Sequence, residues 1–327
     1  MIRLKPITKE QLDKVCDFNK KIMAAFLTDS TELSPTTRMS YESSLKVWFV
    51  YVSERCENRR HIDIKPLDYK RFTSWCMVER GASSSDTNSK RSAISSLNAY
   101  IETYYGTEFP QFRSFITRAI KRPPTVFIKE KKPLTRAEFN NLIEVLKSCN
   151  EWQKIAYLTF SLDCGCRRAE SMQLLRSVVD SEPIIKERDN KRIKFYRTHP
   201  IRCKGRGEVG KVRRLTFGEA TMETLKRWVG MRQDTCPFMF ITKRDGVIRQ
   251  ASRTLFNHWF ANEFSKIVGR RLSPHDLRRG RATMLSQEDG VDVKKISALL
   301  GHDRIDTTTS HYIIRDDADD LDDLYIL

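Results

Sequence analysis

The sequence predicts a mainly α protein with a small antiparallel β-sheet, divided into an all-helical domain and a following α+β domain. Apolar residues recur at helical spacing through most of the chain. Residues 183–216 are the exception, because β-branched residues alternate there around a glycine cluster, which is typical of short antiparallel strands. A proline- and lysine-rich segment at residues 121–133 separates the two parts, and 327 residues suffice for about two domains.

The first domain, residues 1–120, is predicted to contain about four or five helices. Ser34 followed by Pro35 is a typical helix start, with serine as the N-cap and proline at the first helical position. The helix that follows is expected to present one apolar face, made of Tyr41, Leu45, Trp48, Phe49 and Val52. The polar stretch at residues 81–91 is interpreted as a connection to a further helix near Ser89–Tyr105.

A basic linker is expected between the domains, at residues 121–133 with the sequence KRPPTVFIKEKKP. The Pro-Pro pair opposes helix, and the lysine-rich remainder is unsuited to burial. We therefore expect an extended segment that can lie along a phosphate backbone. The second domain is placed at residues 134–315 and an acidic tail at residues 316–327.

The second domain is predicted to begin with helices. Thr135 and Glu138 have the spacing of a capping box. A second helix is expected at residues 152–162. Strands follow at residues 183–216, with the basic, glycine-rich segment 204–210 at a hairpin tip. Helices are expected to resume near Gly218 and to continue to the end of the chain.

The charge balance indicates a polyanionic partner. The chain has 59 Lys and Arg residues against 42 Asp and Glu residues, for a net charge of +17, although residues 316–323 contain six aspartates. Nucleic acid is the first candidate. A membrane partner is not expected, because no single basic amphipathic helix dominates and no stretch of about 20 apolar residues occurs. The N-terminus lacks the apolar region of a secretory signal, so we expect a cytoplasmic protein.

The eight cysteines do not form a zinc motif. None has C-x-x-C spacing, and Cys164-x-Cys166 has no second ligand pair at a usable distance. We interpret them as reduced thiols of a cytosolic protein and expect no metal and no cofactor. The aspartate run at residues 316–323 is interpreted as a surface tail.

Four short motifs in the second domain carry the functional signal. The first is CGCRRAES, residues 164–171, a glycine turn followed by two arginines and Glu170. The second is the glycine-rich hairpin tip with Lys204. Taken alone, an arginine pair at a helix start or a lysine in a hairpin is usually a solvated cation.

The other two motifs supply histidines, an arginine and a tyrosine. SPHDLRRGRAT places His275 and Arg278 on one helix face. In LLGHDRIDTTTSHY, Gly301 is positioned to stop a helix, His302 follows in the turn, and Tyr312 lies ten residues further on. A lone histidine is more often structural than catalytic. The ordered set G-x-R-x-x-E, K-G, H-x-x-R, L-G-H and Tyr is the informative observation.

This ordered set resembles the tyrosine recombinase (phage integrase) family over essentially the whole chain. The resemblance implies a core-binding (SAM-like) DNA-binding domain at residues 1–120 and a catalytic domain at residues 134–315. It also implies that the tail, residues 316–327, docks on a neighbouring subunit. The implied supporting carboxylate is Glu170, and the implied catalytic residues are Arg167, Lys204, His275, Arg278, His302 and Tyr312.

Two assignments have alternatives. Arg168 directly follows Arg167, but the Gly-x-Arg and Arg-x-x-Glu spacings favour Arg167. Tyr325 is a fallback for Tyr312 as the nucleophile.

The residue types suit attack on a phosphodiester. Arg167 and Arg278 would neutralise the growing negative charge with forked donors. A tyrosine hydroxyl has an ordinary pKa near 10, so it needs that positive field or a base such as His275. His302 would donate to the phosphate, and Lys204 would protonate the leaving 5′-oxygen. The product would be a 3′-phosphotyrosyl enzyme, formed without ATP or metal.

The resemblance implies a site-specific recombinase that exchanges strands between two double-stranded DNA sites with a specific core sequence. It would act as a homotetramer, with an accessory directionality protein as a further candidate partner. The alternative is a type IB topoisomerase-like or telomere-resolving enzyme that uses the same chemistry. A binding-only architectural protein fits less well, because binding needs neither the tyrosine nor the Gly-His turn.

DNA contacts are expected from the linker and from two helices that could enter the major groove, at Ser89–Tyr100 and Arg249–Phe264. The residues predicted to contact DNA are Lys90, Arg91, Lys121, Arg122, Lys131, Lys132, Arg249 and Arg253.

Overall fold

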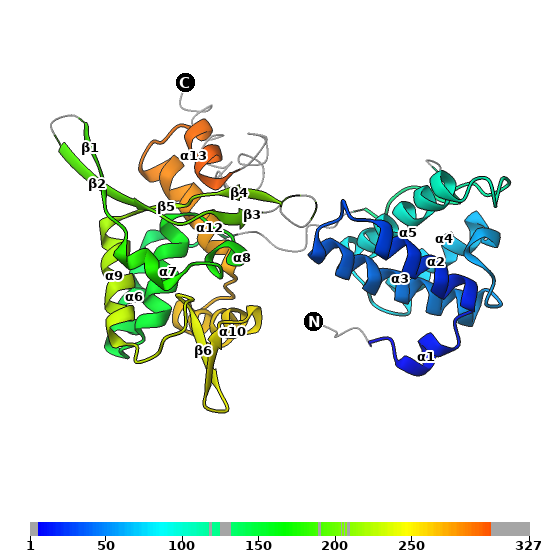
Figure 1. Ribbon diagram of the computed structural model, residues 1–327, viewed down its shortest axis with the longest axis horizontal. Coiled ribbons are helices and arrows are strands. Elements are labelled where there is room, and N and C mark those ends of the chain that lie inside the picture. The colour runs from blue at the N-terminus through cyan, green and yellow to red at the C-terminus, as the bar shows by residue number, and fades with distance from the viewer. Residues whose placement is uncertain are drawn as a thin grey trace, which may run out of the picture. The chain divides into compact units, whose positions relative to one another are not determined.

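The computed structural model describes residues 6–117, 120–124, 132–188, 191–203, 205, 207 and 210–301. The chain divides into two compact units (Figure 1), of which the first comprises residues 1–129 and 205–210 and the second comprises residues 130–204 and 211–327. The predicted fold class, mainly α with small antiparallel sheets, is confirmed. No helix in the described part of the chain is long and apolar enough to cross a membrane.

Every regular element described in the first unit is a helix. Its elements are α1 (Lys9–Asp13), α2 (Asp17–Asp29), α3 (Pro35–Arg55), η1 (His61–Asp63), α4 (Pro66–Val78) and α5 (Ser84–Tyr104). The start of α3 is as predicted, since the Ser34 hydroxyl accepts the Thr37 N–H at 3.2 Å. Fully buried Trp48 of α3 donates its indole N–H to Nδ1 of buried His61 at 3.0 Å, which joins α3 to η1 inside the core.

Helix α5 corrects two predictions. It begins at Ser84, within the polar stretch interpreted as a connection, because the Ser83 hydroxyl caps it by accepting the Asp86 N–H at 3.1 Å. Lys90 is only 5% exposed, and its ammonium donates to Asp86 at 2.6 Å. The expectation that Lys90 reaches into a DNA groove is therefore wrong, because its charge is used inside the unit.

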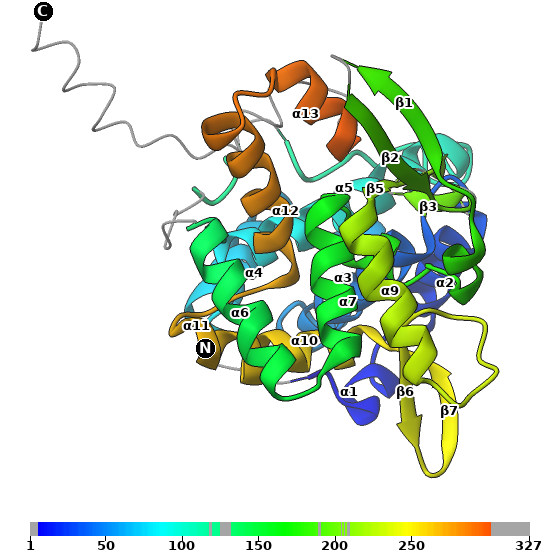
Figure 2. The same cartoon turned by 90° about the vertical axis from the view of Figure 1, so that its left-hand side faces the viewer.

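The second unit surrounds the buried helix α7. The helices α6 (Arg136–Ser148), α9 (Glu219–Met231) and α12 (Pro274–Thr283) all contact α7, and Figure 2 shows α7 between α6 and α9. The other helical elements are α8 (Arg168–Ser171), η2 (Arg176–Asp180), α10 (Arg253–His258), η3 (Trp259–Phe264), α11 (Ser265–Val268), η4 (Met284–Glu288) and α13 (Val293–Leu300), in addition to α7 (Trp152–Asp163). The predicted capping box of α6 is confirmed: the Thr135 N–H donates to Glu138 at 2.9 Å, and the Glu138 N–H donates to the Thr135 hydroxyl at 3.2 Å.

In the described part of the chain the strands form three small antiparallel groups rather than the single small sheet predicted. They are β1 (Ile184–Arg188), β2 (Lys191–Arg197), β3 (Ile201–Cys203), β4 (Lys211–Arg213), β5 (Thr216–Gly218), β6 (Ile241–Arg244) and β7 (Val247–Gln250). Strands β1, β2 and β5 form one sheet, β3 pairs with β4, and β6 pairs with β7. The β3–β4 pair is the predicted hairpin around residues 204–210, and Ile201 is opposite Arg213 in its register.

The β6–β7 hairpin was not predicted. Asp245 and Gly246 both have positive φ at its turn, and Asp-Gly is a strong signal for a two-residue hairpin turn. The predicted helix Arg249–Phe264 is therefore wrong in its first turn. Arg249 lies on β7, and the helix begins at Arg253 after the Ser252 N-cap, whose hydroxyl accepts a backbone N–H.

Candidate active site

A glycine turn after α7 brings the first motif against the end of α13. Gly165 has a φ of +56°, which glycine adopts without penalty. A Cβ at this position would lie 2.7 Å from Cδ2 of Leu300, so a side chain at position 165 would require the buried Leu300 side chain to shift. The predicted glycine turn thus also provides a packing contact between distant motifs.

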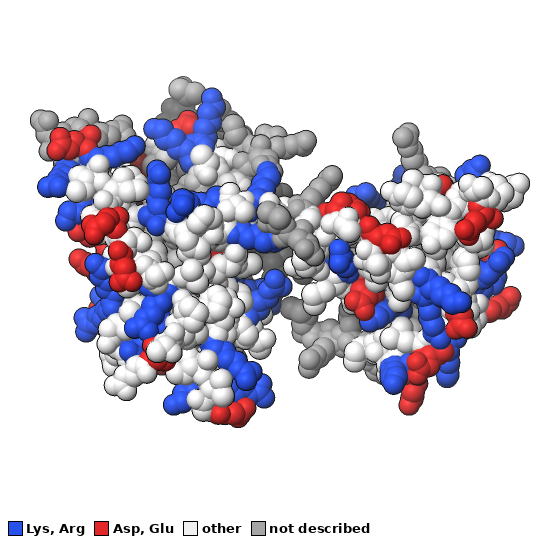
Figure 3. Space-filling view, in the orientation of Figure 1, with Lys and Arg blue, Asp and Glu red and all other residues white. Residues whose placement is uncertain are grey.

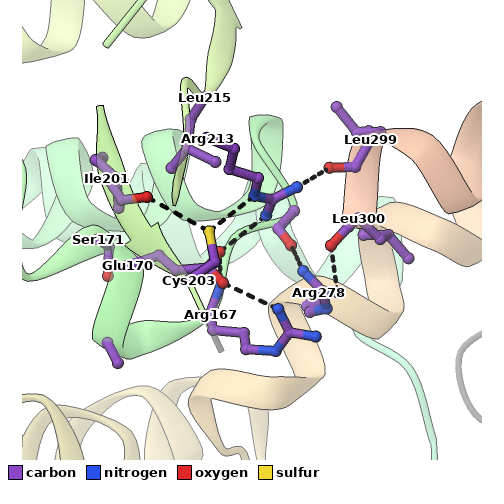
Figure 4. Close-up of polar contacts among 12 residues, drawn as sticks. Arg167, Glu170, Ser171, Ile201, Cys203, Arg213, Leu215, Arg278, Leu299 and Leu300 are labelled. Atoms are coloured by element: carbon purple, nitrogen blue, oxygen red, sulfur yellow. Dashed lines mark hydrogen bonds and ion pairs between the residues drawn. The ribbon is translucent and has the colours of Figure 1, made fainter. Parts of the chain in front are cut away.

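Arg167 is oriented by Glu170. Its backbone N–H donates to Oε2 of Glu170 at 3.0 Å, and its guanidinium Nη1 donates to Oε1 at 2.9 Å. Figure 4 shows this pair next to the β3–β4 hairpin. The Arg167 side chain is 26% exposed, whereas that of Glu170 is 1% exposed. A buried carboxylate therefore fixes a guanidinium that still reaches the surface.

Glu170 has a second cationic partner that the sequence did not reveal. Arg213 of β4 donates Nη2 to Oε2 of Glu170 at 2.9 Å. Burial alone would raise the pKa of the Glu170 carboxyl, but Arg213 and the donors of Arg167 outweigh burial and hold that pKa below its usual value. No spacing in the sequence indicates this contact, because β4 lies 43 residues after Glu170.

Arg278 is the most deeply buried cation of the site, with a side chain at 0% exposure. Its Nη1 donates to the carbonyl of Gly165 and its Nη2 to the carbonyl of Leu300, both at 2.6 Å. A buried charge is costly unless polar groups compensate it. These two carbonyls fix the Arg278 guanidinium beside the turn that leads into Arg167 (Figure 4).

His275 lies in the first turn of α12, which starts at Pro274 as expected. Its side chain reaches solvent, yet partial burial, assisted by the positive charges of Arg279 and Arg278, lowers the pKa of His275 to about 4. The imidazole is therefore neutral at pH 7.

The end of α13 is held by arginines from two other elements. Arg213 donates Nη1 to the carbonyl of Leu299 at 2.7 Å, while Arg278 holds the carbonyl of Leu300. Gly301 ends the helix in the left-handed region with a φ of +66°, which confirms the predicted stop. A Cβ on Gly301 would lie 2.7 Å from Nη1 of Arg213, so any side chain there would require the Arg213 guanidinium to shift.

The neighbouring arginines have other partners. Arg168 donates to Asn257 of α10, so Arg167 rather than Arg168 is paired with the buried carboxylate. Arg279 pairs with Asp276 of its own helix at 3.0 Å. The structure therefore brings Arg167, Glu170 and Arg278 together.

Several predicted site residues lie outside the described residues. They are Lys131, Lys204, His302, Tyr312 and Tyr325, together with most of the linker and the whole acidic tail.

The remaining predicted DNA contacts mostly lie at the surface. Lys121, Arg122 and Lys132 are exposed, as are Arg249 and Arg253. Arg91 is half-buried, with its guanidinium 5.9 Å from the centre of the Tyr69 ring. Figure 3 shows basic side chains over much of the visible face of the second unit, including the region of the β6–β7 hairpin. Among the described residues, no group of three or more His, Cys, Asp or Glu side chains is arranged to hold a metal ion.

Comparison with known proteins identifies consistent relatives. Residues 132–318 match the model of the phage integrase family. The SPbeta prophage-derived recombinase-like protein YomM of Bacillus subtilis is 27% identical over 329 residues, covering 99% of this chain and 96% of that protein. Tyrosine recombinase XerA of Thermococcus onnurineus is 26% identical over 188 residues, covering 57% of this chain and 60% of that protein.

Solved recombinase structures share the fold. XerH site-specific recombinase, bound to palindromic difH substrate in a post-cleavage complex, aligns with a TM-score of 0.64 at 16% identity, over 96% of this chain and 95% of that one. The integrase of transposon Tn1549, in complex with transposon right end DNA, aligns with a TM-score of 0.66 at 17% identity, over 94% and 99%. At these identities the likeness establishes the fold.

Proposed function

Because the chain belongs to the phage integrase family, we propose that it is a site-specific tyrosine recombinase, which cuts and rejoins double-stranded DNA through a 3′-phosphotyrosyl intermediate. The observation that carries this proposal is the pair of oriented arginines. Arg278 donates to the carbonyl of Gly165, two residues before Arg167, and Arg167 is itself oriented by buried Glu170. The Arg167 guanidinium, which still reaches the surface, can offer donors to an anionic phosphodiester, and buried Arg278 adds a fixed positive charge behind it.

In the proposed reaction, the hydroxyl oxygen of Tyr312 forms a bond to the scissile phosphorus, and the bond from phosphorus to the 5′-oxygen breaks. Negative charge grows on the non-bridging oxygens, where Arg167 and Arg278 neutralise it. Preorganised donors of this kind each lower a barrier by about 3 kcal/mol. His275, neutral at pH 7, accepts the tyrosine proton or orients the phosphate.

The leaving 5′-oxygen takes its proton from Lys204, and His302 donates a hydrogen bond to the phosphate. One phosphoester replaces another, so bond energy is conserved and the reaction needs neither ATP nor a metal ion. Attack on the phosphotyrosine by the 5′-hydroxyl of a second duplex then exchanges strands. We propose that a homotetramer on two DNA sites carries this out.

We assign the parts of the chain accordingly. Residues 1–120 are the core-binding domain, residues 121–133 the linker, residues 134–315 the catalytic domain, and residues 316–327 a tail that docks on a neighbouring subunit. The exposed cations that we propose to contact the DNA backbone are Lys121, Arg122, Lys132, Arg249 and Arg253, assisted by Arg91.

The proposal is tested by trapping the covalent intermediate. Purified protein is incubated with a pool of duplexes carrying a randomised central segment, and DNA that stays attached after SDS denaturation is amplified and sequenced. The enriched duplex is then synthesised with a nick next to the cleavage position. The wild-type protein should form an adduct that peptide mass spectrometry maps to Tyr312.

Two variants and one substrate decide between the alternatives. Tyr312→Phe should abolish the adduct, whereas Tyr325→Phe should still form it. An adduct that maps to Tyr325 would overturn the assignment of the nucleophile. Relaxation of supercoiled plasmid that lacks the enriched sequence would instead support a topoisomerase-like enzyme. No adduct with any duplex would overturn the proposed function.

A further inference from the structure

The Arg213 side chain on β4 contacts three other elements around the arginine pair. Its Nη2 donates to Glu170 after the first motif at 2.9 Å, and its Nη1 donates to the carbonyl of Leu299 in α13 at 2.7 Å. Its Nε donates to Sγ of Cys203 on β3 at 3.2 Å. Figure 4 shows the guanidinium between the hairpin and the end of α13.

We propose that Arg213 is a positioning residue for the cleavage reaction. It fixes the carboxylate that orients Arg167 and, with the same guanidinium, fixes the helix end from which the chain continues to His302. This inference rests on the proposed function, since it concerns the geometry of the same site. Among the described residues its polar partners are Glu170, Leu299 and Cys203, and we propose that it acts through the first two.

The contacts of Glu170 show what the loss of Arg213 would do. Oε2 accepts both the Arg167 backbone N–H and Arg213, while Oε1 accepts the Arg167 guanidinium. The charged and titratable groups that face this carboxyl are Arg167 and Arg213 and the thiols of Cys166 and Cys203. Without Arg213, one cation would remain to stabilise a carboxylate that is 1% exposed.

The pKa of Glu170 should therefore rise when Arg213 is removed, because burial would be opposed by fewer positive charges. A protonated Glu170 accepts more weakly and holds Arg167 less firmly. The end of α13 would change as well, since Leu299 would lose the donor on its carbonyl. Displacements of about 1 Å in such a site cost on the order of 100-fold in rate.

The test compares Arg213→Met with Arg213→Lys and with a matched control, Arg214→Met. Methionine preserves much of the length of arginine but removes every donor. Lysine restores a positive charge near Glu170, but it lacks the two terminal nitrogens with which arginine donates to both Glu170 and Leu299. Arg214 is the adjacent residue, is exposed, and donates instead to the carbonyl of Thr198 at 3.1 Å.

Single-turnover cleavage of the nicked duplex is measured at saturating DNA between pH 5 and pH 9, and DNA affinity is measured separately. Arg213→Met should cleave about 100-fold more slowly, while its Kd stays within about threefold of wild type. Arg213→Lys should recover part of the rate. Arg214→Met should stay within about threefold of wild type in rate.

The pH profile separates positioning from simple loss of stability. Wild-type Glu170 stays ionised below its usual pKa, so its titration should not limit the rate above pH 5. In Arg213→Met the acid side of the profile should move to higher pH, because Glu170 becomes protonated earlier. If Arg213 had a purely structural role, Arg213→Met would reduce the folded fraction without moving the acid side of the pH profile.

Each outcome is decisive. If the wild-type protein forms no adduct, the proposed function fails. If the wild-type protein cleaves and Arg213→Met cleaves at the same rate with the same pH profile, the positioning role is wrong. Should Arg213→Met fail to fold, Arg213→Lys decides the question: a rate at least tenfold lower supports the inference, and a wild-type rate overturns it.

Discussion

The close approach of Gly165 to Leu300 gives a stability prediction whose size follows from the structure. In Gly165→Ala the new Cβ would lie 2.7 Å from Cδ2 of Leu300, whereas carbon atoms pack at about 3.5–4.0 Å. Overpacking of this kind costs about 1–3 kcal/mol. The φ of +56° adds about 1–2 kcal/mol for any residue with a Cβ. We expect a total loss of about 2–5 kcal/mol in the free energy of unfolding of the second unit.

A matched control isolates the contact from the backbone strain. Gly246 has a φ of +75° in the β6–β7 turn, but nothing lies within 4 Å of a Cβ placed there. Gly246→Ala should therefore cost only the conformational part, about 1–2 kcal/mol. In a domain of this size, each kcal/mol of lost stability lowers the melting temperature by about 2–4 °C. The melting temperature should therefore fall by roughly 4–20 °C for Gly165→Ala and roughly 2–8 °C for Gly246→Ala.

Calorimetry of the intact chain measures both variants, and a double-mutant cycle with Leu300→Ala tests the cause. Leu300→Ala removes the methyl group that the new Cβ meets, so it should restore part of the stability lost in Gly165→Ala. The variant with both substitutions should therefore lose at least about 1 kcal/mol less than the two single losses added together. If Gly165→Ala costs no more than Gly246→Ala, or if the cycle is additive, the tight contact is not what requires glycine.

Three further predictions follow from buried polar and charged side chains. Glu170→Gln keeps the size of the side chain but removes the charge between two arginines, so cleavage should fall about 100-fold at saturating DNA in the single-turnover assay. His61 is fully buried and its pKa is lowered to about 4, below an unfolded value near 6.5. The contribution of neutral His61 to the free energy of unfolding is complete above pH 6.5 and falls by about 3 kcal/mol as the pH falls toward 4. Denaturation of the first unit between pH 4 and 7, compared with that of His61→Gln, measures this change. Because Lys90 is buried with Asp86, Lys90→Met should leave the salt dependence of DNA binding unchanged, whereas Arg253→Met should reduce the slope of log Kd against log salt by about one.

Local signals in the sequence were reliable guides to the fold. The Ser34 cap, the Thr135–Glu138 box and the Gly301 stop all appear as predicted, since each depends on residues within about one helical turn. The start of α5 was predicted too late because serines were interpreted as loop residues, although Ser83 is an N-cap. The β6–β7 hairpin was missed even though Asp245-Gly246 is a recognisable turn signal.

The site was predictable only in part. The ordered motifs identified Arg167, Glu170 and Arg278, which the structure brings together. The contribution of Arg213 could not be predicted, because it depends on where β4 lies relative to Glu170 and α13, and no local pattern encodes that position. The roles of Lys204, His302 and Tyr312 stay predictions from the motif order.

The contacts at the end of α13 explain why distant motifs must act together. The last carbonyls of a helix have no partner within it. Here Arg213 donates to the carbonyl of Leu299 and Arg278 donates to the carbonyl of Leu300. The Gly165 carbonyl accepts from the same Arg278 guanidinium. The G-x-R, H-x-x-R and L-G-H motifs are thus joined through backbone oxygens. Substitutions that displace this backbone should impair every motif at once, even where they alter no side chain that faces the phosphate.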